Sequence, residues 1–552
     1  MLELSGIKIA LAGLDGTDEA ELKAVRHTTL RMLHLQPSDL VSLELRKRSV
    51  DARRKNDVHL TITARLALRG GSNAERALIE KSRSWRRAPK LSVAEEDPYR
   101  LPATTAPLGD TRPVVVGAGC AGLFCALALA QAGQRPLLVE RGDGSRERSR
   151  AIETFNKTGV LDTESNIQFG LGGAGTFSDG KLTTGTKSPS HRLILKTFVD
   201  AGAPQRILWD AKPHIGSDIL PAVVQHIMRR IEELGGEIRL RTRMTGLGMS
   251  SGRICSVTLA SCDEDGATRE ETLRTERVVL ACGHSARDVY QLLCDQGVTL
   301  ERKPFAMGVR IEHLQADIDR AQYGTAAGHA ALGAAPYKLA VHLPSGRGAF
   351  SFCMCPGGYV VAAASETGGV VTNGMSLSDR AGTNANAGLL ANVFPTDLPG
   401  DDVLAGMELQ RACERAAFEA GGGGYVAPAQ LVADFLKNTP SSSGGDISPT
   451  YPRGVSWGSV DCCLPSYVAE TLRGAIPLMA RKLRGFDRTD AVLTGVESRS
   501  SSPVRVTRDD NGQSVSTVGL FPCGEGAGYA GGIMSAAADG LRTAEWVLSS
   551  LR

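Results

Sequence analysis

One short glycine-rich segment constrains the fold of this chain more than any other part of its sequence. Gly117-Ala-Gly119-Cys-Ala-Gly122 follows the apolar run 114–116 and leads into a stretch with helical spacing over 121–132. Glu140 stands 23 residues after Gly117, at the end of a second apolar run. A strand, a tight glycine turn, a helix and a second strand that ends in an acid form the βαβ unit of a Rossmann fold. The segment therefore predicts a dinucleotide site, with the pyrophosphate at the helix N-terminus and the ribose at Glu140.

A second glycine-rich segment distinguishes FAD from NAD, which the first segment does not separate. Near the C-terminus a strand-like run ends at Gly524-Glu525, and a helix-like stretch begins at Gly531-Gly532-Ile533. These residues resemble the second FAD motif of the large two-domain flavoproteins. The resemblance implies that Glu525 meets the ribityl or pyrophosphate part and that 531–533 lie by the flavin C2 carbonyl, where a positive helix end stabilises reduced flavin. The run 278–284 likewise resembles the connecting Ala-Thr-Gly motif of that superfamily, with Cys282 in place of Thr.

A third segment, 164–181, contains another match to GxGxxG, but no suitable strand precedes it, so we do not interpret it as a second Rossmann site. With several other segments it resembles the uncharacterised bacterial and plastid family of FAD-dependent dehydrogenases, or NAD(P)/FAD-dependent oxidoreductases, within the glutathione-reductase-like FAD superfamily. The other segments are 212–216, 283–288, 351–358, 371–376, 495–503 and 524–532. The resemblance implies that 164–181 embraces the flavin, where Lys181 stabilises the anionic reduced form. The alternative for Lys181 is an ordinary surface lysine.

Together these patterns predict an α/β fold with a discontinuous Rossmann-type FAD-binding domain over 113–300 and 491–552. An α+β substrate or cap domain is expected at 301–490, and a linker over 93–112 joins a small basic α/β domain over 1–92. The residues expected to contact FAD are Gly117, Ala118, Gly119, Cys120, Ala121, Gly122, Glu140, Arg141, Gly173, Ser178, Gly180, Lys181, Met244, Gly283, Gly524, Glu525, Gly531, Gly532 and Ile533.

Four residues are candidates for catalysis beside the flavin. Glu497 and Arg499 precede the C-terminal FAD motif, as a base and as a clamp for an anionic substrate; the alternative is a Glu–Arg ion pair that braces the domain seam. Lys181 is the third candidate. The alternation of Arg310-Ile-Glu312-His313 fits a strand that lines a pocket, which makes His313 the fourth, although single histidines, including His284 and His214, are more often structural.

Cysteine usage favours a reducing compartment. The 12 cysteines are scattered, no CxxC pairs have zinc-ligand spacing, and no metal site is predicted. In Cys353-Met-Cys355 the two thiols could relay electrons to a flavin, but on a regular strand they would share one face, where they rarely close a disulfide, so a structural role is favoured over a redox role. The N-terminus lacks a secretory pattern and the apolar stretch 114–132 is interpreted as strand, turn and helix, so a cytoplasmic protein without a membrane span is expected.

Charge is uneven along the chain. Residues 46–90 hold 14 Lys or Arg and four Asp or Glu, a local net charge of +10, whereas the whole chain carries +3. This basic segment is either a solvated or docking surface or a footprint for RNA.

Three functions remain open. The first is an FAD-dependent oxidoreductase acting on a small molecule; because no second Rossmann unit is visible, electrons come from the substrate or from NAD(P)H bound transiently. The second is a flavoprotein that acts on RNA through its N-terminal domain, and the third uses FAD as a structural or sensory group. The substrate and the oligomeric state are not predicted.

Overall fold

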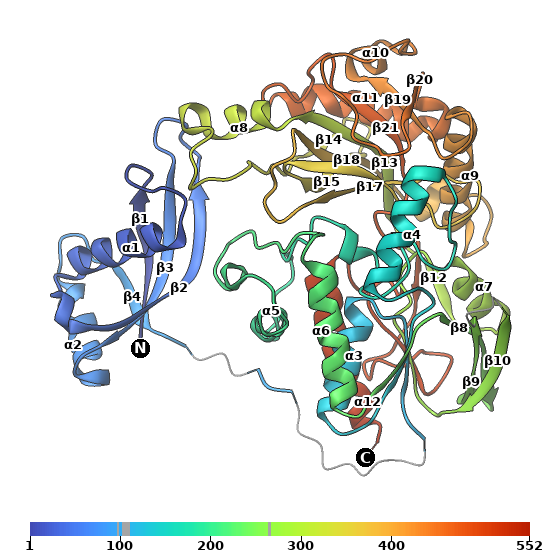
Figure 1. Ribbon diagram of the computed structural model, residues 1–552, viewed down its shortest axis with the longest axis horizontal. Coiled ribbons are helices and arrows are strands. Elements are labelled where there is room, and N and C mark those ends of the chain that lie inside the picture. The colour runs from blue at the N-terminus through green and yellow to red at the C-terminus, as the bar shows by residue number, and fades with distance from the viewer. Residues whose placement is uncertain (96–98, 102–110, 263–266, 552) are drawn as a thin grey trace.

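The computed structural model describes residues 1–95, 99–101, 111–262 and 267–551 (Figure 1). Most of the predicted linker over 93–112 lies outside the described residues. Among the described residues, no helix has the length and apolar character needed to cross a bilayer.

The predicted Rossmann unit forms a five-stranded parallel sheet in the order β23-β11-β5-β6-β7. Its strands are β5 (Val114–Val116), β6 (Leu137–Val139), β7 (Glu237–Arg239), β11 (Val278–Leu280) and β23 (Leu520–Pro522). One face packs on a helical layer of α3 (Cys120–Gln131), α5 (His191–Asp200), α6 (Leu220–Glu233) and α12 (Ile533–Ser549). The strands β5, β6, β11 and β23 are fully buried, which is why their sequences are apolar runs, whereas the edge strand β7 is only partly buried. The predicted α/β, Rossmann-type fold is therefore confirmed.

An antiparallel meander covers the other face of this sheet, together with α7 (Arg287–Asp295). The meander consists of β8 (Thr242–Ser250), β9 (Arg253–Cys262) and β10 (Thr268–Arg274). Residues 237–239 do not belong to the meander; they form the edge strand β7 of the parallel sheet. Arg241 has a left-handed φ of 50° and turns the chain between the two strands. The side chain of Arg241 holds this turn through ion pairs to Asp143 and Asp162.

A seven-stranded sheet, β14-β15-β18-β13-β21-β19-β20, stands above the helical layer (Figure 1). Its strands are β13 (Phe305–Leu314), β14 (Ala340–His342), β15 (Gly348–Cys355), β18 (Asn384–Val393), β19 (Ala427–Leu431), β20 (Val455–Trp457) and β21 (Val492–Glu497). The sequence suggested short, irregular strands here, yet β13 and β18 each have ten residues. Both are buried almost throughout, so they lack the alternation that marks a half-exposed strand.

Helices and a hairpin cover this larger sheet. The helix α11 (Ser466–Ala480) contacts four of its strands. The hairpin of β16 (Gly358–Ala362) and β17 (Thr372–Ser376) packs against β13, β15, β18 and β21. The remaining elements are α4 (Ser145–Thr158), α8 (Gln315–Tyr323), α9 (Ala405–Ala420), α10 (Val432–Lys437), and the strand pair β12 (Leu300–Arg302) and β22 (Val504–Val506).

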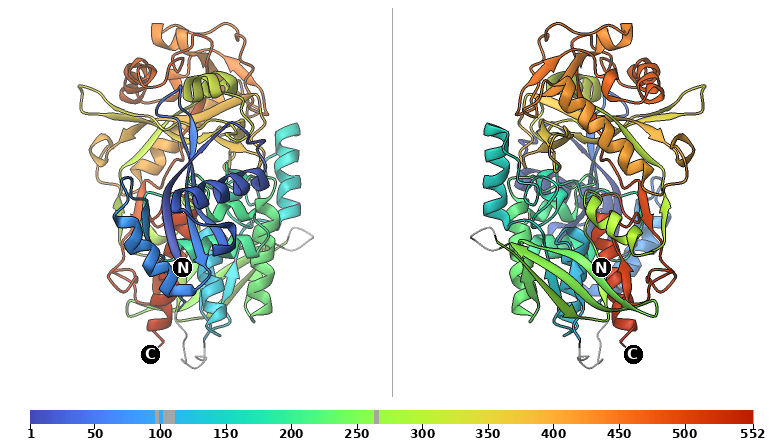
Figure 2. Two further views of the ribbon diagram at one scale, coloured as in Figure 1. Left: turned by 90° about the vertical axis from the view of Figure 1, so that its left-hand side faces the viewer. Right: turned by 90° about the vertical axis from the view of Figure 1, so that its right-hand side faces the viewer.

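The N-terminal unit is a separate antiparallel sheet in the order β2-β3-β1-β4, with the βαββαβ succession of a ferredoxin-like fold. Its elements are β1 (Leu2–Ala10), α1 (Asp18–Leu33), β2 (Leu40–Asp51), β3 (His59–Leu68), α2 (Gly71–Arg83) and β4 (Lys90–Val93). It faces the viewer in the left view of Figure 2. Arg48 connects it to the rest of the chain through a hydrogen bond of 2.7 Å to the Ala331 carbonyl and an ion pair to Asp210, while an ion pair to Glu21 holds Arg48 within the unit.

The basic segment thus supplies a docking residue, as one alternative for it predicted. Many of its other Lys and Arg side chains are exposed. RNA binding by this unit stays a prediction, to be checked by the salt dependence of RNA binding with and without residues 1–92.

Candidate functional site

The site is built around the N-terminus of α3, which no side chain of the described residues caps. Gly117 has φ +100°, and a Cβ there would lie 2.4 Å from the Ala281 carbonyl oxygen. A Cβ on Gly122 would lie 1.9 Å from the carbonyl oxygen of Gly117. These close approaches explain why the turn needs glycine, and they leave the first amides of α3 free to bind an anion.

A glycine-rich loop over 166–173 lies against this turn. The Gly172 amide donates to the Ala118 carbonyl at 2.8 Å, and a Cβ on Gly173 would lie 3.0 Å from the Cα of Gly119. The loop is held from behind by Arg148 of α4, which is fully buried and donates to five carbonyl oxygens at 2.8–3.3 Å. The acceptors are the carbonyls of Asn166, Ile167, Gly170, Leu171 and Gly173. Sequence reasoning missed Arg148, because three arginines alternate over 146–150 and nothing local tells which one is buried.

Glu140 lies at the end of β6, as predicted, and its carboxylate already has three protein partners. It accepts hydrogen bonds from the amides of Ala118 at 2.8 Å, Gly142 at 3.0 Å and Gly170 at 2.9 Å. A carboxylate offers about four acceptor positions, so roughly one remains for a ribose hydroxyl. Glu140 therefore ties the glycine turn to the loop 166–173, and its contact with ribose stays a prediction.

The N-terminus of α12 lies close to the N-terminus of α3. A Cβ on Gly540 would lie 2.2 Å from the Ala121 carbonyl oxygen, and one on Gly175 would lie 3.0 Å from the side chain of Ile533. Figure 1 shows α3 and α12 side by side under the seven-stranded sheet. The α12 N-terminus also lacks a side-chain cap among the described residues. Two helix N-termini with free amides thus converge, an arrangement that suits an anionic cofactor.

The glycines at the α12 end leave open space beside the protein backbone. A Cβ added to Gly531, Gly532 or Gly283 would meet no atom within 4 Å. Gly524, in contrast, is held by its amide, which donates to Asp539 at 2.8 Å. Open glycines next to two uncapped helix ends fit an extended FAD.

Three titratable residues, Glu525, Lys303 and His284, lie beside this open space. Burial raises the pKa of Glu525 to about 7, while Lys303 lowers it. His284 Nε2 lies 4.0 Å from the Glu525 carboxylate, and burial, with nearby Arg499 and Arg287, lowers the pKa of His284 to about 4. At neutral pH, His284 is therefore neutral, and Glu525 is close to its own titration point.

Lys181 lies on the loop that follows the glycines of 172–175. Its Nζ stands 3.6 Å from the carboxylate of the buried Asp179, and among the described residues it has no hydrogen-bond partner. Although burial opposes the effect, the charges of Lys181 and Arg380 hold the pKa of Asp179 below its usual value. The Ser178 hydroxyl donates a hydrogen bond to the Gly175 carbonyl at 2.7 Å and accepts one from the Gly180 amide at 3.2 Å. Ser178 and Gly180 therefore shape the loop.

The carboxylate of Glu497 is paired with Arg310 and is not free for a substrate. Arg310 Nη1 donates to both Glu497 oxygens at 2.8 Å, and both side chains are buried. Burial raises the pKa of Glu497 to about 7 even though Arg310 opposes it. Arg310 Nη2 also donates to the Cys353 carbonyl at 2.6 Å and lies 3.4 Å from Cys355 Sγ. Glu497 therefore positions Arg310 beneath the CxC segment.

Arg499 belongs to a buried ion network instead of a substrate clamp. Glu414 of α9 accepts from Arg499 at 2.7 and 2.9 Å and from Arg287 of α7 at 2.8 and 2.9 Å. Although burial opposes the effect, these two arginines hold the pKa of Glu414 well below its usual range. The alternative of an ion pair at the domain seam fits Arg499, but its partner is Glu414 and not Glu497.

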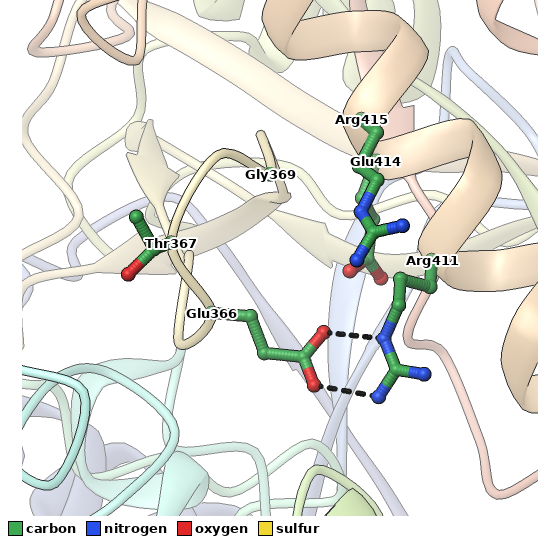
Figure 3. Close-up of a pocket in the computed structure, with 6 residues that line it drawn as sticks. All are labelled: Glu366, Thr367, Gly369, Arg411, Glu414 and Arg415. Atoms are coloured by element: carbon green, nitrogen blue, oxygen red, sulfur yellow. Dashed lines mark hydrogen bonds and ion pairs between the residues drawn. The ribbon is translucent and has the colours of Figure 1, made fainter.

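The network borders a surface cavity of about 260 Å³ (Figure 3). There Glu366 and Arg411 face each other through paired hydrogen bonds, and Glu414 lies behind them on α9.

The other predicted site residues lie in different surroundings. Arg141 pairs with Glu164 and Asp288 and borders a second cavity of about 290 Å³. Met244 is buried in the apolar layer under the meander, so its side chain is not open to a ligand. His313 is buried against Phe486, whose carbonyl lies 2.9 Å from Nε2, and burial lowers its pKa to about 4. The structure gives His313 a packing role.

Family models match three parts of the chain. They are described as "FAD binding domain" over 112–151, "FAD-dependent protein, C-terminal domain-like" over 304–500, and "domain of unknown function (DUF8436)" over 2–67. An uncharacterized protein of Clostridium beijerinckii is 40% identical over 529 residues, which cover 96% of each chain. This chain belongs to the same family as that clostridial protein. FAD is the cofactor of this chain, as predicted. Its membership of the glutathione-reductase-like superfamily stays a prediction.

Two solved flavoprotein structures are distantly similar. A glycerol-3-phosphate dehydrogenase from Bacillus halodurans in complex with FAD is 11% identical, with 80% of this chain and 64% of that chain covered and a TM-score of 0.33. Glycine oxidase from Bacillus cereus is also 11% identical, with 80% and 96% covered and a TM-score of 0.30. Neither likeness assigns a substrate.

The open space beside Gly531 gives a direct test of the FAD site. In Gly531→Ala the new Cβ meets no protein atom, so we expect the apoprotein to keep its melting temperature while FAD affinity falls about tenfold, or about 1.4 kcal/mol. Titration of the apoprotein with FAD, followed by fluorescence, measures the affinity. Gly458→Ala is the matched control, because its Cβ also meets nothing within 4 Å. Unchanged FAD affinity in Gly531→Ala would place the cofactor elsewhere.

Proposed function

We propose that this FAD-dependent protein is an oxidoreductase, a dehydrogenase or reductase, that carries out hydride transfer between flavin N5 and a small molecule. The observation that carries the proposal is the convergence of two uncapped helix N-termini with the charged side chains of Glu525 and Lys181. Bound FAD would supply reversible two-electron chemistry at its flavin ring. The amides of α3 and α12 would hold it, and the loop 166–181 would close over it.

The chain's own residues divide into holding and reacting groups in this proposal. Lys181 is the residue best placed to favour negative charge on the reduced cofactor, because its Nζ has no hydrogen-bond partner among the described residues. Glu525, with a pKa of about 7, is able to take or give a proton near neutral pH. Glu497 and Arg499 act as positioning residues, since their polar atoms are taken up by Arg310 and Glu414.

The source of electrons follows from the topology. The described residues form a single parallel sheet of the Rossmann type, and its glycine turn serves FAD. NAD(P)H, if it is the donor, therefore binds transiently near the flavin instead of in a domain of its own.

The test is an anaerobic reduction of the purified holoprotein. Its visible spectrum should show the flavin band near ~450 nm, and NADH and NADPH are then added in turn. Rapid bleaching supports a nicotinamide-fed reductase, and a yellow protein that ignores both supports a dehydrogenase fed by its substrate. A protein that cannot be reconstituted with FAD would contradict the proposal.

Lys181 gives a prediction for this reaction. In Lys181→Met a positive charge beside the reduced flavin is lost, so we expect the flavin reduction potential to fall by about 30 mV, equivalent to about 1.4 kcal/mol for a two-electron couple. Spectroelectrochemical titration measures the potential. Lys187→Met, at an exposed position on the same loop, should leave it unchanged. An equal potential in both variants would make Lys181 an ordinary loop lysine.

A further inference from the structure

We propose that Cys353 and Cys355 form a redox pair that alternates between dithiol and disulfide at the flavin side of the seven-stranded sheet, and that its substrate class is a small disulfide. The supply of electrons to this pair rests on the proposed flavin chemistry. The existence of the pair does not.

On a regular strand the two cysteines of a CxC segment rarely close a disulfide, but β15 is not regular at this point. In β15, Phe352 pairs with Gly388 and Cys355 pairs with Asn386, so two residues of β15 lie opposite one residue of β18. This is a β-bulge, and Cys353 within it has a left-handed φ of 39°. The bulge turns the segment back on itself, and Cys355 Sγ lies 3.1 Å from the Cys353 carbonyl oxygen. The two cysteines therefore do not follow the alternation of a flat strand.

Arg310 holds the bulge in this shape. Its Nη2 contacts both the Cys353 carbonyl and Cys355 Sγ, and its Nε donates to Asn386 at 2.9 Å. A left-handed φ is unfavourable at a residue other than glycine and is found where the surroundings impose it. Here a buried arginine, itself fixed by Glu497, imposes it on a cysteine.

The two thiols have unequal surroundings, as thiol exchange requires. Cys353 is partly exposed, whereas Cys355 is fully buried. The neighbouring Cys355 thiol, with the charges of Lys181 and Arg310, lowers the pKa of Cys353, and burial raises that of Cys355 well above its usual value. An accessible thiolate is the attacking group in exchange, and the buried thiol is the one that resolves the mixed disulfide.

The position of the pair connects it with the cofactor. The charge on Cys353 acts on Glu525 of the C-terminal FAD motif and is itself stabilised by Lys181 of the loop 166–181. Both segments belong to the proposed flavin pocket. Cys353 thus stands between the sheet and the pocket.

The reaction balances as two exchanges. The Cys353 thiolate attacks one sulfur of a small disulfide, the S–S bond of that disulfide breaks, and the departing thiolate takes a proton. Cys355 loses its proton and attacks Cys353 Sγ, which forms the Cys353–Cys355 disulfide and releases the second small thiol. The small disulfide gains two electrons and two protons, one from Cys355 and one from solvent. Return of the protein disulfide to the Cys353 thiolate and the Cys355 thiol takes one proton and two electrons, which bound reduced FAD would supply.

Electron counting tests the pair with oxidised glutathione as the small disulfide. Holoprotein pre-oxidised with oxidised glutathione and then desalted should take up about four electrons per FAD in an anaerobic dithionite titration, whereas Cys353→Ser should take up about two. Cys355→Ser should instead keep glutathione bound to Cys353 as an unresolved mixed disulfide, seen as a mass increase that dithiothreitol removes. Cys462→Ser is the matched control, because Cys462 and Cys463 are the other close pair, with sulfurs 3.5 Å apart, and it should behave as wild type. Uptake of about two electrons by pre-oxidised wild type would overturn the proposal.

A second measurement keeps the pair testable even without FAD. Unreacted thiols are alkylated after incubation in glutathione buffers of defined ratio, and the peptide with both cysteines is weighed by mass spectrometry. Joint protection of Cys353 and Cys355, reversed by dithiothreitol, supports the pair. Alkylation of both at every ratio would overturn it, whether or not hydride transfer is observed.

Discussion

Replacement of Arg148 by methionine is expected to abolish FAD binding and to lower the free energy of unfolding by about 4–5 kcal/mol, because the loss of a buried hydrogen-bonded charge exposes unsatisfied partners. Arg148 is fully buried and its pKa, lowered by burial to about 10, keeps it charged at neutral pH. Without it, five carbonyls of the loop 166–173 lose their donor in an apolar interior. The loop then no longer packs on the turn at Gly119.

Chemical denaturation and the flavin content of the purified protein measure this effect. Arg146→Met and Arg150→Met, at exposed positions of the same helix, should change stability by less than about 0.5 kcal/mol. The stability and flavin content of Arg148→Lys should fall between those of wild type and Arg148→Met, since one ammonium group reaches fewer carbonyls than the guanidinium. An Arg148→Met protein that stays yellow and stable would show that the loop does not depend on this side chain.

Replacement of Glu414 by glutamine is expected to lower the free energy of unfolding by about 3–5 kcal/mol, because it removes the buried counter-charge that Arg287 and Arg499 share and leaves them only the partly exposed Glu366. Arg287 and Arg499 are 2% and 3% exposed, so water cannot replace the lost carboxylate. The N–H groups of the glutamine amide would also point at a guanidinium group, which has no hydrogen-bond acceptor. The junction of α7, α9 and the end of β21 would loosen as a result.

The same substitution should change the acid sensitivity of the fold. The pKa of Glu414 is lower in the folded chain than in the unfolded chain, so its contribution to stability is complete above the unfolded value and is lost as pH falls toward the folded value. Stability of Glu414→Gln should therefore decline less steeply below about pH 5 than that of wild type. Urea melts across pH measure the slope. Glu408→Gln, an exposed residue of the same helix, is the control, and equal slopes in all three proteins would contradict the role of Glu414.

Sequence spacing predicted the Rossmann-type fold and the FAD cofactor. Gly117, Gly122 and Glu140 act through backbone geometry within one βαβ unit, and the structure shows each in close contact with its neighbours. The glycines before α12 are open instead, since a Cβ on Gly531 or Gly532 would meet no atom within 4 Å. Local spacing predicts such features because a turn and a helix end depend on residues a few positions apart.

The reactive side of the site was predicted less well. Glu497 and Arg499 were expected to face a substrate, yet Arg310 and Glu414, which are distant in sequence, take up their polar atoms. The bulge at Cys353 was missed as well, because it arises from the register of β15 against β18 and not from the CxC spacing. His313 has the alternation of a pocket residue but packs on Phe486.

The sequence by itself determined that this chain forms a Rossmann layer and binds FAD, since both follow from short-range patterns of glycine, apolar residues and a single acid. Only the tertiary structure decided which arginine supports the glycine loop, which carboxylate meets Arg499, and how Cys353 comes to lie beside Arg310. The physical reason is that a buried charge needs a partner, and the choice among chemically equal partners is made by the register and packing of sheets that bring distant segments together.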